Sequence, residues 1–101
     1  MSQRSDSIDN FLVKAGWGGV TRSSLADDAS FRHYERIKIN DKTAILMDAP
    51  PPHENVLPFI RITRHLEKLG YSVPQIFEED IDAGFLLIED LEIKNYIYTF
   101  I

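Results

Sequence analysis

The sequence has 101 residues, with 11 Lys and Arg against 16 Asp and Glu, so its net charge is −5. A chain of this length holds one small core at most, and an acidic chain without a basic block argues against nucleic acid as a partner. The absence of cysteine excludes disulfides and thiolate metal sites, and because no apolar run resembles a membrane span or a signal peptide we expect a cytoplasmic protein with no membrane partner.

The first half of the chain predicts one helix and three strands. Residues 5–16, SDSIDNFLVKAG, have apolar side chains at the spacing of one helix face, with Gly16 placed to end the helix: Ile8, Phe11, Leu12 and Ala15. The segment 24–39 predicts two antiparallel strands around a turn at DDAS, residues 27–30. Residues 43–47 then predict a third strand.

The second half predicts one helix and two strands. Pro58 suits the first turn of a helix that Gly70 ends, and its predicted buried stripe is Phe59, Ile62, Leu66 and Leu69. Two strands follow within YSVPQIFEE (71–79) and AGFLLIEDL (83–91). Residues 85–88 form a continuous apolar run, which is typical of a central strand buried on both faces.

Five segments in this order carry a resemblance to a known family: AGWG at 15–18, LADDASFRHYERI at 25–37, AILMDAPPP at 44–52, LPFIRITRHLEKLGYSVPQI at 57–76 and GFLLIEDL at 84–91. Together they resemble the N-terminal part of the aminoglycoside phosphotransferase family. Within that family they are most similar to the bacterial cell-wall sugar kinases, which phosphorylate the anomeric hydroxyl of N-acetylmuramate or N-acetylglucosamine.

The resemblance implies an α+β fold: a protein-kinase-like small lobe, with a five-stranded antiparallel sheet, an N-terminal helix and one helix between strands 3 and 4. Residues 1–91 would form this nucleotide-binding lobe and residues 92–101 the truncated start of a C-terminal lobe. The lobe would position ATP with Mg²⁺ for phosphoryl transfer to a sugar hydroxyl.

The family's catalytic aspartate and magnesium ligands belong to a large lobe, so we expect no catalytic residue and no metal ligand in this chain. We therefore expect weak nucleotide binding, no activity of the chain alone, and either a separately encoded catalytic lobe or self-association through the apolar segment 94–101. The alternatives are a non-catalytic protein-interaction module and a gene remnant.

DDASFR, residues 27–32, takes the place of the loop that covers the phosphates, and the resemblance assigns nucleotide contacts to Ala29, Ser30, Phe31 and Arg32. The loop has no glycine, so an ordinary hairpin turn is the alternative. Laid against the family pattern, Met47 stands at the position of the strand lysine that meets the phosphates, and Phe59 near its glutamate partner. Replacing both charges is coherent, because one alone would be buried unpaired.

Arg32 is then the candidate cation for the phosphates; the alternative is a solvated strand arginine. At the hinge, the resemblance assigns the backbone carbonyl of Glu89 and the N–H of Leu91 to the adenine, while core residues with solvated acids are the alternative. Asp48 invites interpretation as a metal ligand, but we expect it to accept backbone N–H groups at a turn. We expect Glu54 to be a solvated acid, and we assign no chemistry to His33, His53 and His65.

Overall fold

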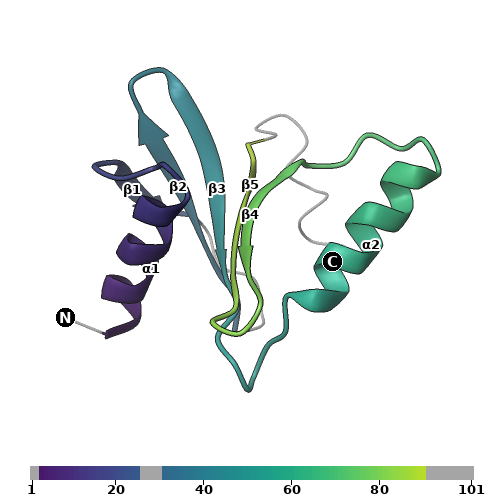
Figure 1. The fold of residues 1–101 in the computed structure, drawn as a ribbon, viewed down its shortest axis with the longest axis horizontal. Coiled ribbons are helices and arrows are strands. Elements are labelled where there is room, and N and C mark those ends of the chain that lie inside the picture. Colours follow the sequence, from purple (N-terminus) through teal and green to yellow (C-terminus); the bar gives the residue numbers. More distant parts are fainter. Residues whose placement is uncertain (1–2, 26–30, 91–101) are drawn as a thin grey trace.

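The computed structural model describes residues 3–25 and 31–90, which fold around one antiparallel sheet. The elements in chain order are α1 (Gln3–Lys14), β1 (Thr21–Ser24), β2 (His33–Ile39), β3 (Lys42–Asp48), α2 (Leu57–Lys68), β4 (Ile76–Asp80) and β5 (Phe85–Glu89). The strand order in the sheet is β1-β2-β3-β5-β4, and the two helices lie on its opposite sides (Figure 1). Ala29, Ser30, Leu91 and the segment 92–101 lie outside the described residues.

The predicted fold class is confirmed. The sheet has five antiparallel strands, one helix precedes it, and one helix lies between strands 3 and 4, which is the layout of a kinase-like small lobe. α1 begins two residues before its predicted start, and its predicted apolar face is buried through Ile8, Phe11 and Leu12.

The strand β5 is the centre of the core, as its apolar run predicted. It lies between β3 and β4, and alternate side chains of a strand point to opposite faces of the sheet. Phe85 and Leu87 pack in the cluster that α1 covers, and Leu86 and Ile88 in the cluster that α2 covers. All four side chains are at most 1% exposed, so the strand is buried on both faces.

The first strand was predicted wrongly. β1 occupies Thr21–Ser24, so only its last residue falls within the segment 24–39 in which we expected it. Its four residues, TRSS, carry no apolar alternation, and their strand conformation comes from pairing with β2, in which Thr21 lies opposite Lys38 and Ser24 opposite Glu35. A short polar edge strand of this kind is defined by its neighbour and not by its own sequence pattern.

The buried stripe of α2 was predicted wrongly at two of its four positions. Ile62 is 44% exposed and Leu69 61%, whereas the buried face is formed by Phe59, Ile60 and Thr63. Residues follow one another at about 100° around a helix, so Ile62 and Leu69 lie more than a quarter turn from the centre of that face. The apolar spacing fits two overlapping stripes, and packing against the sheet selects the one that includes Ile60.

Candidate functional site

The loop that joins β1 to β2 ends beside the last residue of β3. In the β2–β3 pairing, His33 lies opposite Asp48 and Tyr34 opposite Met47. Phe31 and Arg32 therefore precede β2 at the same end of the sheet where the chain leaves β3 toward α2. This is the end at which the sequence placed the phosphate-covering loop.

Two contacts join this loop end to the connection between β3 and α2. The rings of Phe31 and His53 are stacked with their centroids 4.3 Å apart, and Nε of Arg32 lies 3.5 Å from Oε1 of Glu54. The side chains of Arg32 and Glu54 are only 16% and 20% exposed. The expectation that Glu54 is a solvated acid is therefore wrong, because Glu54 is paired with Arg32, and the alternative of a solvated arginine does not hold for Arg32. The sequence also gave no role to His53.

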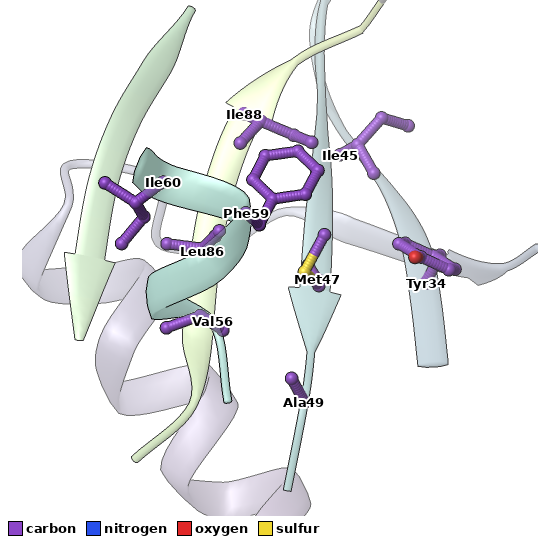
Figure 2. Packing of buried hydrophobic residues seen from close by; sticks show 9 residues of the cluster. All are labelled: Tyr34, Ile45, Met47, Ala49, Val56, Phe59, Ile60, Leu86 and Ile88. Atoms are coloured by element: carbon purple, nitrogen blue, oxygen red, sulfur yellow. The ribbon is translucent and has the colours of Figure 1, made fainter. Parts of the chain in front are cut away.

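Met47 and Phe59 lie inside the core and belong to the same apolar cluster. Their side chains are 0% and 2% exposed, and Figure 2 shows both between α2 and the sheet. The cluster also contains Tyr34, Ile45, Ala49, Val56, Ile60, Leu86 and Ile88. That Met47 and Phe59 take the places of the family's strand lysine and helix glutamate stays a prediction, as does contact of Met47 with a nucleotide.

Asp48 forms an ion pair with Arg4, and our expectation of a turn cap was wrong. Nε of Arg4 donates to Oδ1 of Asp48 at 2.7 Å, and Nη2 of Arg4 donates to the carbonyl of Ala83 at 2.6 Å. The same guanidinium lies 4.5 Å from the centre of the Phe85 ring. The acid that ends β3 therefore ties α1 to two strands of the sheet, a role that only the packed position of α1 could reveal.

At the other end of the site, β5 leads toward the predicted hinge. The N–H of Glu89 donates to the carbonyl of Gln75 at 2.8 Å, and the N–H of Gln75 donates to the Glu89 carboxylate at 3.1 Å. The role of the Glu89 carbonyl toward adenine stays a prediction.

Asp90, which sequence reasoning did not single out, anchors the end of β5 to β2. Nε and Nη2 of Arg36 donate to its two carboxylate oxygens at 2.9 and 3.3 Å, and the Asp90 side chain is only 4% exposed. For Asp90, the alternative of a solvated acid is therefore wrong. A bidentate pair of this kind fixes the direction in which the chain leaves the sheet.

Arg22 forms ion pairs with two acids and so links β1, β2 and α1. Nε and Nη2 of Arg22 donate to the two oxygens of Glu35 at 2.6 and 3.0 Å, and Nη1 donates to Asp9 at 2.7 Å. Nε2 of His33 also lies 3.3 Å from Oε2 of Glu35. The hydrogen bonds from Arg22 hold the pKa of Glu35 below its ordinary value, against the opposing effect of burial, and His33 adds a smaller contribution.

This arrangement predicts that the protein loses part of its free energy of unfolding as the pH falls, and that Glu35→Gln makes this loss smaller. Because the pKa of Glu35 is lower in the folded than in the unfolded chain, its contribution is complete above the unfolded value of about 4.3 and is lost as the pH falls through the folded value. Urea unfolding at pH 7 should show the variant less stable by roughly 1–3 kcal/mol. Below pH 4 the difference should shrink; a difference that stays constant with pH would contradict the prediction.

Neither a metal centre nor a membrane span is found where the structure describes the chain. Within residues 3–25 and 31–90, no three side chains of His, Cys, Asp or Glu are arranged so that they could hold a metal ion. In the same ranges, neither helix has the length and apolar character needed to cross a membrane.

Comparison with known proteins extends over most of the chain. Residues 21–97 match the family model described as the phosphotransferase enzyme family. The chain is 39% identical over 93 residues to an N-acetylmuramate/N-acetylglucosamine kinase of Pseudomonas aeruginosa, and 42% identical over 95 residues to the protein of the same name from Pseudomonas putida. These alignments cover 89% and 91% of the chain.

A protein of that name from Neisseria meningitidis is 36% identical over 67 residues, which are 65% of the chain. The chain spans only 28% of the length of either Pseudomonas relative and 20% of the Neisseria relative. The similarity to these kinases therefore concerns one part of their length.

Proposed function

Because the chain belongs to the phosphotransferase enzyme family, we propose that residues 1–91 are a nucleotide-binding lobe that positions ATP for phosphoryl transfer to a sugar hydroxyl. The sugar belongs to the same proposal: the relatives named above are kinases of N-acetylmuramate and N-acetylglucosamine. A cytoplasmic location, expected from the sequence, is part of it as well.

The observation that carries the proposal is the spacing of the loop end and the hinge along β3. His33, where the loop enters β2, lies opposite Asp48, and Glu89, at the hinge, lies opposite Ala44. These positions are four residues apart on β3, or roughly 13 Å at the rise of a strand. That is the length scale of an extended nucleoside triphosphate, so adenine at the hinge would direct its phosphates toward Arg32.

In this proposal the contacts with ATP divide between the two ends of the site. Ala29, Ser30, Phe31 and Arg32 would form the phosphate end, and the carbonyl of Glu89 with the N–H of Leu91 the adenine end. Met47, whose side chain is 0% exposed, would support the nucleotide site from the apolar core behind it. Magnesium, when bound with ATP, would neutralise phosphate charge, and no described residue is proposed as its ligand.

A second candidate, a non-catalytic interaction module, is supported by exposed apolar side chains on α2 and just after it. Ile62, Leu69 and Tyr71 are 44%, 61% and 63% exposed. Contacts of such side chains with a partner, including a separately encoded catalytic lobe or a second copy of the chain, would bury apolar surface. This reading requires no nucleotide contact, so a binding experiment separates the two.

The test is a titration of the 101-residue chain with ATP, followed by NMR chemical shifts. We expect a Kd on the order of millimolar, because one lobe supplies backbone donors, one cation and apolar contacts. Shifts should concentrate at residues 31–34 and 88–90. The chain alone should transfer no phosphate to N-acetylmuramate or N-acetylglucosamine.

If ATP at 10 times the expected Kd causes no chemical-shift changes at these two sets of residues, the proposal is rejected in favour of the interaction module. Micromolar, magnesium-dependent binding would instead show that the chain itself supplies metal ligands, and the assignment of the phosphate end would then be wrong.

A further inference from the structure

A lysine–glutamate pair is absent from the core at Met47 and Phe59, but another ion pair, Arg32–Glu54, lies at the edge of that core. The two core positions are occupied by Met47 and Phe59, both at most 2% exposed. Arg32 and Glu54 form an ion pair at 3.5 Å at the nearby end of the sheet, and their side chains keep 16% and 20% of their surface exposed. The cation therefore lies where a soluble ligand can approach it, whereas a side chain at position 47 is sealed beneath α2.

The strand register explains why this pair lies beside Met47. Tyr34 lies opposite Met47, and both pack in the cluster that α2 covers. Side chains two residues apart on an extended chain point to the same face, so Arg32 lies on the side of Tyr34, just beyond the end of β3. The Arg32–Glu54 pair thus joins the sheet to the connection before α2, in the way that a strand lysine and a helix glutamate join them in kinase-like lobes.

The connection that carries Glu54 is conformationally restricted. It begins with Pro50, Pro51 and Pro52, whose rings fix φ, and the N–H of Glu54 donates to the carbonyl of Pro50 at 3.1 Å. The stacking of His53 on Phe31 adds a second contact between the same two segments. Glu54 is therefore presented to Arg32 from a rigid segment, as a side chain that orients a ligand-binding group must be.

We infer that Arg32 and Glu54 replace the buried lysine–glutamate pair: Arg32 binds the triphosphate of the nucleotide, and Glu54 is the positioning residue that holds the guanidinium at the strand end. The inference rests on the proposed function. A guanidinium offers several donors in a planar fork that matches phosphate oxygens, so Arg32 can contact a phosphate while Glu54 stays beside it. Glu54 carries a single negative charge and the triphosphate several, so the ligand competes well for the arginine.

The experiment compares the affinities of the 101-residue chain for ATP, adenosine and inorganic tripolyphosphate, all by NMR titration. Arg32→Gln should weaken ATP and tripolyphosphate binding about tenfold, the loss expected for one charge-assisted contact, and leave adenosine binding unchanged. Glu54→Gln should weaken ATP binding about threefold, and Glu54→Asp should restore part of that loss. The matched controls are Lys14→Gln and Asp9→Asn, because both side chains are exposed on α1, which covers the opposite face of the sheet from Arg32 and Glu54.

A charge exchange separates phosphate binding from a purely structural role. The double variant Arg32→Glu/Glu54→Arg keeps an ion pair between the two segments but places a carboxylate at position 32. We expect it to remain folded and to lose ATP binding by at least the tenfold factor of Arg32→Gln. Unchanged ATP affinity in Arg32→Gln or in the double variant would overturn the inference and leave the proposed function standing. Equal losses of ATP and adenosine affinity in these variants would do the same. Failure of the unaltered chain to bind ATP at all would overturn both.

Discussion

Gly84→Ala is expected to lower the free energy of unfolding by about 2–5 kcal/mol, a large part of the stability of a small domain. Gly84 has φ +80° in the turn between β4 and β5, where a side chain costs roughly 1–2 kcal/mol. A Cβ at this position would also collide with the carbonyl oxygen of Ala49 and lie 3.2 Å from Cδ of Pro51. The N–H of Ala49 donates to the carbonyl of Gly84 at 2.8 Å, so neither backbone segment can move away without losing that bond.

Gly70→Ala is the matched control for this prediction. Gly70 also has a positive φ, +91°, but a Cβ there would meet no atom within 4 Å. Its replacement should therefore cost only the conformational part, roughly 1–2 kcal/mol. The difference between the two losses, measured by urea unfolding of both variants, isolates the cost of the collision with Ala49. The comparison is valid if the two variants have the same m value. Equal losses for the two variants would show that the close approach of residues 49 and 84 is not a constraint on the fold.

The elements that the sequence predicted correctly are those whose burial is encoded locally. The run from Phe85 to Ile88 is apolar at every position, which only a strand buried on both faces requires, and the structure places it inside the sheet, between β3 and β4. The four residues of β1 have no such pattern, because an edge strand is fixed by its pairing with β2. In α2, Ile60 and Ile62 are equally apolar, and only docking on the sheet decides that Ile60 is buried.

The segments that form the candidate site stay a prediction from the family pattern, whereas the contacts of their charged side chains could not be predicted from the sequence. Family pattern placed the phosphate end near Arg32 and the hinge near Glu89, yet the partners of the charged residues come from distant parts of the chain. Arg32 meets Glu54, and Arg36 meets Asp90, because the antiparallel register and the path of the chain into α2 bring them together. Long charged side chains reach several neighbours, and their choice depends on packing that no local spacing records.

The cluster beneath α2 allows a direct test of why both core charges are absent. Met47→Lys should lower the free energy of unfolding by about 3–5 kcal/mol, because Met47 is 0% exposed and a lysine there would be buried without a partner. Phe59→Glu should cost a similar amount for the same reason. In the double variant the two new side chains lie in one cluster between α2 and β3, where they can pair, so its loss should be smaller than the sum of the single losses by more than about 1 kcal/mol.

The control for this cycle is Leu46→Lys combined with Phe59→Glu. Leu46 is also 0% exposed, but it packs in the cluster that α1 covers, on the opposite face of the sheet from Phe59. Its lysine cannot reach the new glutamate, so the two losses should add within roughly 0.5 kcal/mol. Unfolding in urea would be measured with trimethylamine N-oxide present, which keeps destabilised variants folded at the start of the titration. Additive losses for Met47→Lys and Phe59→Glu would show that these positions are not paired across the lobe, and that the apolar residues at 47 and 59 do not stand in for a joint lysine–glutamate pair.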